Sequence, residues 1–508
     1  MDDIKEVKLS QAQELPAYAS DSQSEAAESA DEQLATLGYK PELRRVHSFW
    51  TLMAFQTTIL CSWSCNIVVY DYIFTLGGVM SLVWSTILVG IGQTLLMASL
   101  AEYAGIWPQA GGQQFLTQMV APEKMRRFLS YVVGWAVLIG EISTSSSCAV
   151  NSAQILAAFI EVTHPDVVWK PWMTFLVYLA FLIGPVVTNL APGFPTVSLS
   201  IWSADFVFTE FMNTSGWNSK GWVFILSMYV PIYGLYGTDS VMHLVEEMKH
   251  PARDAPRVMV WSMVFSSLVA WISAIIMGFT TGNWAAELET TQPYFTWFIN
   301  VTKSVYGGGI FCAITMMGLN YLIIVHTNTA GSRLAWRMAK DGGFPFAKFH
   351  SHNSKRFGTP LRPMFAVLFI NAVAGTLVMG SDLAFWALIS GGGITLQIAY
   401  AVPIICVVCR GREILPPRPY FDLGRWGYLI NWVSLGWSVI TLLFYSFPQY
   451  VPVVGNIENM NWASAIVGGC VVFCALFWVV TGRHTYMKSY NSVVEENIVV
   501  VEGTAAKI

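Results

Sequence analysis

Residues 233–240, Tyr-Gly-Leu-Tyr-Gly-Thr-Asp-Ser, place flexible backbone and an acidic side chain inside an otherwise apolar run. The run covers residues 221–247, long enough to cross a bilayer as a helix. Glycine weakens the helix there, and Asp239 is placed to cap a helix that resumes at Ser240. The N-terminus of such a half-helix has free N–H groups and a positive partial charge, which suit a carboxylate. The pattern predicts a binding site for a small polar solute.

A second polar interruption lies in the first apolar run, where residues 61–66 read Cys-Ser-Trp-Ser-Cys-Asn. A membrane helix can break only where its freed backbone groups face protein or water, because lipid cannot pair with them. Two breaks at this separation fit an inverted repeat whose broken helices meet near the bilayer midplane. The alternative is ordinary close packing by glycine and serine, with Asp239 serving only as a helix cap.

Three further acidic residues are candidates for function. Glu141 lies inside an apolar run, where an ionised side chain costs about 3 kcal/mol to insert. It is interpreted either as a proton carrier or amine-binding carboxylate, or as a protonated acid bonded to the Ser/Thr cluster at 143–147. Glu246 and Glu247 stand beside several basic residues, so we expect them to form ion pairs at a cytoplasmic gate.

The chain that positions these residues has the composition of a membrane protein. Of its 508 residues, 54% are hydrophobic and 12% are charged, and its mean hydropathy is +0.50. Lipid leaves no partner for unpaired backbone groups, so the long apolar runs should be α-helices, and strands are not expected. Eleven spans are predicted, at residues 47–70, 77–101, 127–160, 171–190, 221–247, 258–280, 305–328, 361–380, 383–408, 426–447 and 461–481.

The distribution of Lys and Arg predicts how these spans are oriented. Basic clusters precede the first and third spans, follow the fifth, seventh and ninth, and close the last, which places those segments and both termini in the cytoplasm. Two glycosylation sequons, at Asn213 and Asn300, then fall in outside loops. Residues 191–206 must therefore cross as well. As a helix they reach only about 24 Å, short of a core of about 30 Å.

Four stretches carry a family resemblance: ASLAEYAGIWPQAGGQQF (98–115), SYVVGW (130–135), YGTDSVMHLVEEMKHPARDAPRVM (236–259) and SRLAWRMAKDGGFPF (332–346). They resemble the amino acid-polyamine-organocation transporters, and more narrowly the fungal amino acid/choline/GABA permease branch. The likeness runs from about residue 45 to residue 485. It implies an all-α polytopic membrane protein with a LeuT-like five-plus-five inverted repeat plus two terminal helices, 11–12 transmembrane helices in all. The short crossing is then a truncated helix 5.

The same resemblance implies alternating-access uptake of an amino acid, GABA or choline, with proton coupling, across the plasma membrane. It places the substrate at Ser62, Trp63, Ser64, Tyr236, Gly237, Thr238 and Asp239. The alternative is a transport-dead nutrient sensor, or a nonfunctional splice or gene-model variant of the same fold, because most of helix 5 is missing. Ser64 also stands where many relatives carry an acid. Sequence motifs typical of enzymes are not recognised, so we expect no enzymatic activity.

The remaining predictions concern domains and partners. Residues 1–46 hold ten acidic and five basic residues and are predicted to be a disordered cytoplasmic tail. The transmembrane transporter domain is expected at 47–482, and a cytoplasmic C-terminal tail at 483–508. Eight cysteines lie in or beside apolar runs without further ligands nearby, so we expect them to pack rather than bind metal. Membrane lipid and the solute are the expected partners, with no cofactor and no nucleic acid.

Overall fold

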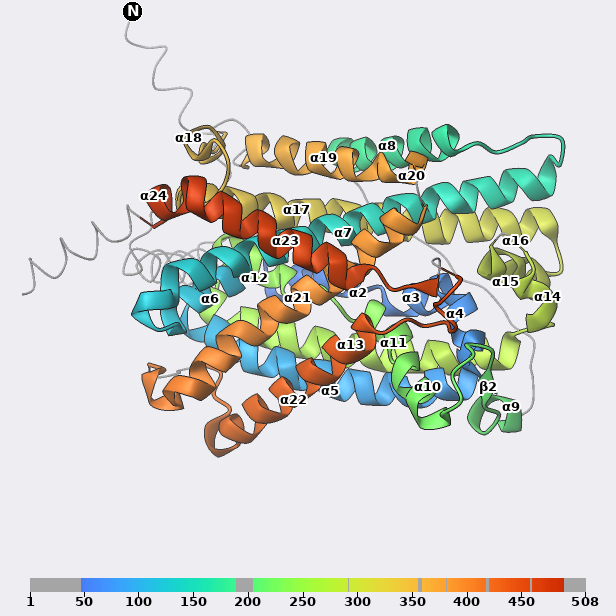
Figure 1. Ribbon diagram of the computed structural model, residues 1–508, viewed down its shortest axis with the longest axis horizontal. Coiled ribbons are helices and arrows are strands. Elements are labelled where there is room, and N and C mark those ends of the chain that lie inside the picture. Colours follow the sequence, from blue (N-terminus) through green and yellow to red (C-terminus); the bar gives the residue numbers. More distant parts are fainter. Residues whose placement is uncertain are drawn as a thin grey trace, which may run out of the picture.

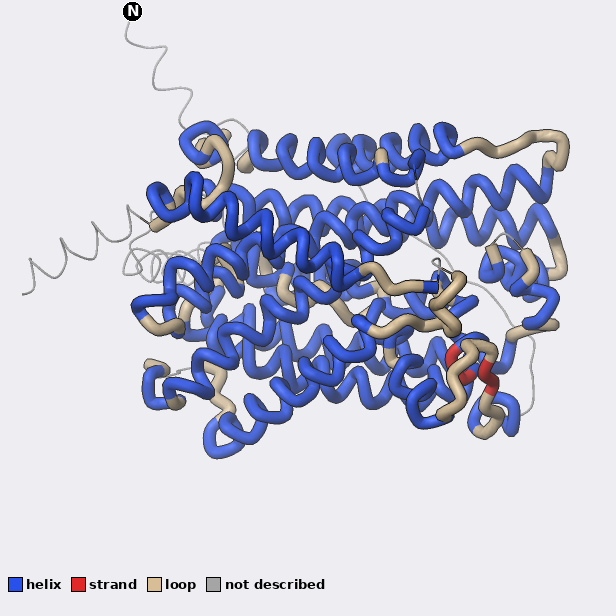
Figure 2. Tube along the Cα trace, viewed as in Figure 1, coloured by secondary structure: helices blue, strands red, loops and turns tan. Residues whose placement is uncertain are grey.

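The computed structural model describes residues 47–188, 204–290, 292–354, 359–380, 382–416, 420–456 and 459–487 (Figure 1). Within these ranges nearly all regular structure is helical, and the long helices extend along the longest axis of the molecule (Figure 2). The two predicted tails lie mostly outside the described residues. So does the short crossing at 191–206, except for its last residues in α9 (Ala204–Phe208). The predictions for these segments stay predictions.

Eight helices among the described residues are long and apolar enough to cross a membrane. All eight fall on predicted spans, and α8 (Pro171–Thr188) provides a shorter apolar helix on a ninth. The chain is therefore an all-α polytopic membrane protein, as predicted. The eight are α5 (Gly78–Ile106), α7 (Glu123–Thr163), α13 (Pro251–Thr280), α16 (Val305–Cys312) continuing through the π-helical turn η3 (Ala313–Met317) into α17 (Gly318–Lys340), α19 (Leu361–Gly375) with α20 (Leu377–Gly380), α21 (Asp382–Arg410), α22 (Gly427–Ser446), and α23 (Ala463–Phe477) continuing through η7 (Trp478–Gly482) into α24 (Arg483–Thr485).

The first and fifth predicted spans are interrupted helices. The first breaks at Cys61, whose φ of 34° is uncommon for a residue other than glycine. The other breaks over residues 234–239, where Gly237 has a φ of 91° that glycine adopts without strain. Both breaks fall where the polar interruptions in the sequence predict them. The pieces are α2 (Phe49–Leu60), α3 (Ser62–Val68) and α4 (Tyr70–Thr75), and then α10 (Lys220–Ser227), α11 (Tyr229–Tyr233), α12 (Ser240–His243) and the 3-10 turn η2 (Val245–Glu247).

The two breaks lie against each other in the centre of the bundle. Gly234 packs so closely on α3 that a Cβ atom there would lie 3.1 Å from the Cα of Ser62 and 2.8 Å from the Cβ of Cys65. This glycine is required by the close approach of two backbones rather than by its φ angle. Such contact between two broken helices is what an inverted repeat predicts.

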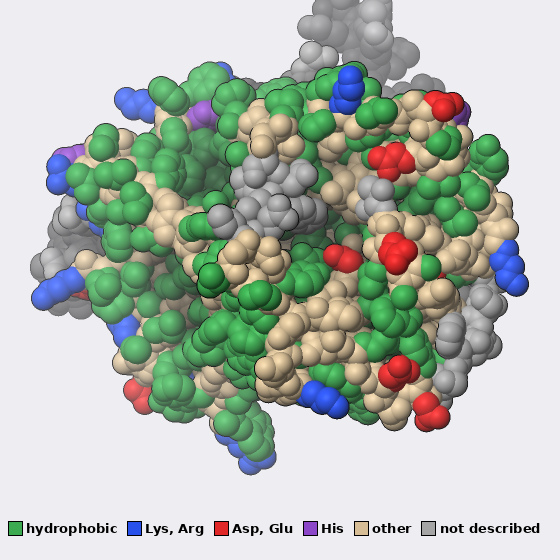
Figure 3. All heavy atoms as spheres, turned by 45° about the vertical axis from the view of Figure 1, so that its right-hand side comes forward, with side chains coloured by type: hydrophobic (Ala, Val, Ile, Leu, Met, Phe, Trp, Pro, Cys, Tyr) green, Lys and Arg blue, Asp and Glu red, His purple; other side chains and the backbone are tan. Residues whose placement is uncertain are grey.

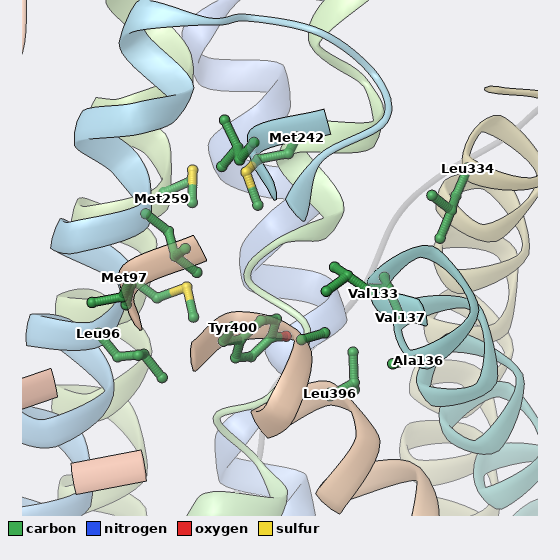
Figure 4. Packing of buried hydrophobic residues seen from close by; sticks show 14 of the residues in the cluster. Leu96, Met97, Val133, Ala136, Val137, Met242, Met259, Leu334, Leu396 and Tyr400 are labelled. Atoms are coloured by element: carbon green, nitrogen blue, oxygen red, sulfur yellow. The ribbon is translucent and has the colours of Figure 1, made fainter. Parts of the chain in front are cut away.

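Straight helices enclose the broken pair. α5 packs along α13, and α7 packs along both α17 and α21. Leu396 and Tyr400 of α21 lie between α5 on one side and α7 on the other (Figure 4). Outward faces carry exposed apolar side chains, such as Leu268 on α13 and Leu476 on α23, and hydrophobic side chains cover much of the surface (Figure 3). An apolar outer face of this kind suits contact with lipid rather than water.

The two ends of the bundle differ in composition. One end, named here the basic end, gathers α6 (Gln113–Val120), α12, α18 (Ala347–His350) and α24, next to the Lys/Arg clusters predicted to be cytoplasmic. Near it lie the 3-10 turns η4 (Arg412–Ile414) and η5 (Gly424–Trp426). The opposite end, named the outer end, gathers α9, α14 (Trp284–Leu288) and α15 (Pro293–Thr302) (Figure 1).

A short strand pair at the outer end corrects the expectation that the chain has no strands. β1 (Leu76–Gly77) pairs antiparallel with β2 (Met212–Asn213), and Leu76 lies opposite Asn213. The pair joins two loops, where extended backbone finds a partner in another loop instead of in lipid. Asn213 and Asn300, the sequon residues, are both exposed at this end.

Candidate functional site

A cavity lies beside the two helix breaks. Ser64 and Cys65 of α3 line it on one side, and Tyr233 and Tyr236 at the second break line it on another. The rest of the wall comes from α7, α17, α21 and α22, including Ser143, Cys148, Asn151, Asn320, Ser390 and Tyr445. We call this the central cavity. Residues from both halves of the chain line it, as expected for a site where two broken helices contact each other.

Tyrosine dominates the central cavity. Tyr229, Tyr233, Tyr236 and Tyr445 all line it, and the ring centroid of Tyr445 lies 4.9 Å from that of Tyr229 and 5.8 Å from that of Tyr236. None of the described lining residues is charged. Hydroxyl and amide groups can orient a polar solute, and the faces of tyrosine rings attract a cation. The wall therefore suits a small solute that carries an ammonium group.

Two further hollows adjoin the central cavity on the side of the outer end. A second hollow shares Asn151, Tyr229 and Tyr233 with it and extends to Asp71 and Gln292. The hollow volume increases from about 60 Å³ in the central cavity to about 210 Å³ in this second space. A third hollow shares Tyr229 and reaches the loop at Tyr450, which lies 6.2 Å from Tyr72 between ring centroids. Three adjoining hollows, each lined in part by aromatic side chains, thus lie between the outer end and the two breaks.

Buried ion pairs close the other side of the molecule. Arg333 Nε donates to Glu247 Oε1 at 2.8 Å, and both side chains are largely buried. Arg337 Nη1 lies 4.0 Å from Glu246 Oε1, and its Nη2 lies 3.5 Å from Asp341 Oδ1. These five residues, named the ion-pair layer, join η2 to α17 at the basic end. The predicted gate residues Glu246 and Glu247 are therefore both ion-paired, but with arginines of α17 and not with the basic residues beside them in the sequence. Their role as a gate stays a prediction.

Burial affects titratable groups in and beside this layer. It raises the pKa of the Asp341 carboxyl, and Arg337 opposes that shift. It lowers the pKa of His47, which lies 3.7 Å from Glu247 Oε2. The end of the last helix also packs here: the buried hydroxyl of Tyr486 accepts hydrogen bonds from the Gln114 and Gln118 amides. The basic end is therefore a closed, desolvated surface.

A buried acidic cluster lies between the central cavity and the ion-pair layer. Tyr400 Oη donates to Asp239 Oδ1 at 2.6 Å, and Asp239 Oδ2 lies 3.5 Å from His243 Nε2. Glu141 Oε1 accepts from Ser240 Oγ at 3.0 Å. One carboxylate oxygen of Glu141, one of Asp239 and a ring nitrogen of His243 all lie within 4.8 Å of one another. All of these side chains are buried. The three titratable groups thus share one desolvated site.

A sequence model of the family described as "Amino acid permease" matches residues 187–475, more than half of the chain. The chain belongs to the amino acid permease family. The "Choline transporter" of Saccharomyces cerevisiae is 26% identical over 472 residues, which cover 87% of this chain and 83% of that protein. "Amino-acid permease 2" of Neurospora crassa is 25% identical over 502 residues, covering 92% and 91%. The "Amino-acid permease BAT1 homolog" of Oryza sativa subsp. japonica is 26% identical over 500 residues, covering 89% and 94%.

Membership of this family indicates that the chain is a membrane permease. Its relatives' names include both amino-acid permeases and a choline transporter, so the family alone does not select the solute. The permease fold and its central cavity are nevertheless the features on which a proposal can rest.

The permease brings only part of the predicted substrate site together. Ser64 and Tyr236 line the central cavity. Ser62 and Trp63 instead line a groove on another face of α3 together with Phe265, and Ser62 Oγ donates to the Ser266 carbonyl at 2.7 Å. Roles of Ser62 and Trp63 in binding stay predictions.

Gly237, Thr238 and Asp239 are buried between the cavity and the basic end. Asp239 occupies the N-cap position of α12, but its side chain makes no capping hydrogen bond. The expectation that it caps the helix is wrong, because Tyr400 takes one carboxylate oxygen and the other faces His243. Glu141 bonds to Ser240 and not to the hydroxyl cluster on its own helix.

Sequence reasoning missed several residues of the site. Tyr229, Tyr400 and Tyr445 come from distant segments that only the folded bundle brings together. His243 was detectable, because a spacing of four residues places it on the same helical face as Asp239. The hollow toward the outer end was not predicted, because its lining comes from separate segments of the chain that only the fold brings together.

Proposed function

We propose that this permease carries a small amino acid or amine, namely an amino acid, GABA or choline, across the plasma membrane by alternating access with proton coupling, and that both termini are cytoplasmic. One observation carries the proposal: a further hollow adjoins the cavity at the two helix breaks on the side of the outer end, whereas buried ion pairs lie on its other side, at the basic end. A site that is accessible from one side at a time is the requirement for alternating access.

Among these solutes the cavity favours one with a quaternary ammonium group. Such a group has no N–H to donate, so it needs ring faces rather than hydrogen-bond acceptors, and four tyrosines provide them. The uncharged wall suits a solute with one positive charge, since no described lysine or arginine of the lining repels it. The name of the yeast relative, "Choline transporter", agrees with this choice.

Uptake by cells that lack their own carriers tests the proposal. Labelled choline, GABA and the amino acids would be supplied separately at external pH 5 and pH 7.5. We expect saturable accumulation of at least one of them, choline foremost, and faster uptake at pH 5. Ser64→Ala should change the KM, whereas Ser351→Ala, in a loop at the basic end away from the cavity, should leave it unchanged. Binding without accumulation would instead identify a nutrient sensor.

A further inference from the structure

We infer that Asp239 and His243 form the site at which the permease takes up and releases its coupling proton. The inference rests on the proposed function and extends it, because His243 carries no role in that proposal. The pair lies outside the central cavity, and both side chains are completely buried.

The hydrogen bonds of His243 fix where its proton lies. Its Nδ1 is 3.0 Å from the carbonyl oxygen of Ala110, which can only accept, so Nδ1 carries the proton of the neutral imidazole. Nε2 then presents a lone pair to Asp239 Oδ2 at 3.5 Å. Neither of these two atoms has another hydrogen-bond partner. Two buried acceptors that face each other are stabilised when one proton lies between them.

The surrounding charges favour the same conclusion. Glu141 is the nearest other acid, and two ionised carboxylates this close in a desolvated site repel each other. One added proton leaves a neutral acid with a neutral imidazole, or an imidazolium paired with a carboxylate. When the proton leaves, Asp239 remains ionised, His243 remains neutral, and Tyr400 continues to donate to Asp239 Oδ1. The pair can therefore hold one proton and lose it without a further reactant.

Charged groups on neighbouring elements lie mainly toward the basic end. Glu141 on α7 and Tyr400 on α21 contact the cluster directly. The elements packed on α12 also carry Arg333 and Arg337 on α17, Asp254 on α13, and the adjacent Glu246 and Glu247 on η2, and most of these acids and arginines are paired with one another. α2, the remaining neighbour, has no titratable residue between Phe49 and Leu60. Glu141 is therefore the group most able to compete for the proton.

Direct contacts connect Asp239 and His243 to the central cavity on one side and to the ion-pair layer on the other. Toward the cavity, Tyr400 bonds Asp239, and its ring centroid lies 6.5 Å from that of Tyr236. Toward the gate, His243 bonds the carbonyl of Ala110, whose N–H donates to Glu246 Oε1 at 3.4 Å. Glu246 belongs to the ion-pair layer. A change of proton occupancy can thus reach a cavity tyrosine and a gate carboxylate through direct contacts.

The test uses the full-length permease in sealed proteoliposomes with the labelled panel named above. Two rates are measured: exchange of labelled against unlabelled solute at equal pH, and solute-driven proton entry reported by an internal pH dye. We expect the wild type to show both. His243→Gln should retain exchange within about threefold and lose at least nine-tenths of the proton entry, and Asp239→Asn should lose the proton entry to the same extent. His164→Gln, at an exposed histidine in a loop of the outer end, should retain both rates.

Each outcome is decisive for one proposal. Retained proton entry in His243→Gln and Asp239→Asn would overturn the inference. It would also be overturned if Glu141→Gln were the only one of the three variants to lose proton entry. Exchange by the wild type without proton entry at any pH would overturn it while leaving the carrier function intact. A wild type that binds but never exchanges any solute would overturn the carrier function as well. Equal thermal melting temperatures of variant and wild type would show that lost coupling is not lost folding.

Discussion

The side-chain amide of Gln56 donates to the backbone carbonyl of Gly237 at 2.9 Å, which joins α2 to the break of the second interrupted helix. The two residues are 181 positions apart, and the bond is buried. Breaking a helix frees carbonyl groups that lipid cannot satisfy. Gln56 bonds one of them, so the first interrupted helix helps to satisfy the break in the second.

Replacing Gln56 by Ala should destabilise the permease by about 0.5–1.5 kcal/mol, because the Gly237 carbonyl loses one hydrogen bond and keeps only the one from the Ser240 N–H. Thermal unfolding in detergent would measure the loss. Thr58→Ala is the matched control on the same helix, since the Thr58 hydroxyl bonds only within α2, to Ala54. Equal melting temperatures for the two variants would show that the bond between the breaks contributes nothing.

Gly237→Ala should impair both stability and transport. The φ of 91° is strained for a residue with a Cβ atom, and the added atom would lie 3.1 Å from Ile59 Cγ2. We expect a loss of about 1–2 kcal/mol in unfolding free energy and an increased KM. Gly221→Ala, where the Cβ would meet nothing within 4 Å, should be neutral or stabilising. A tolerated Gly237→Ala would mean that this break does not need its observed backbone.

Removing one member of the Arg333–Glu247 pair should open the basic end. Arg333→Gln leaves a buried carboxylate without its arginine, at a cost of about 3–5 kcal/mol, and we expect faster efflux of labelled solute from preloaded vesicles. The double variant Arg333→Gln/Glu247→Gln should recover part of the stability, since no charge is then left unpaired. Arg257→Gln is the control, because Arg257 is an exposed arginine. Equal efflux from all variants would show that the layer is not a gate.

The sequence predicted the fold better than the site. Apolar runs located the spans, and Gly234, Gly237 and the polar stretch after Cys61 located both breaks, because lipid imposes a strong and local rule on backbone. Side-chain roles follow no such rule. Ser62 and Ser64 are two residues apart on α3, yet one lines the central cavity and the other bonds α13. Which face of a helix meets the cavity depends on how that helix rotates in the bundle.

The hydrogen bonds of Asp239 were likewise not predictable from the sequence. Its position before Ser240 predicts a helix cap, but a hydroxyl from Tyr400, 161 residues later, takes its carboxylate. Local hydrogen bonds compete with tertiary partners, and a single sequence describes only the local ones. The sequence offered two signs of the buried cluster: Glu141 is an acid inside an apolar run, and Asp239 and His243 are four residues apart and so share a helical face.

The tyrosine wall allows a substitution that separates ring from hydroxyl. Tyr445→Leu removes a ring that packs on Tyr229 and Tyr236, and if a cationic head group binds there, the KM for choline should rise about 5- to 30-fold, equivalent to about 1–2 kcal/mol of cation–π attraction. Tyr445→Phe retains the ring face and should stay within about threefold of the wild type. Tyr428→Leu, on the exposed face of α22, is the control for packing in the same helix. If the Leu and Phe variants lost affinity equally, the Tyr445 hydroxyl would be the group that binds the solute. The solute would then be held by a hydrogen bond and not as a cation against the ring.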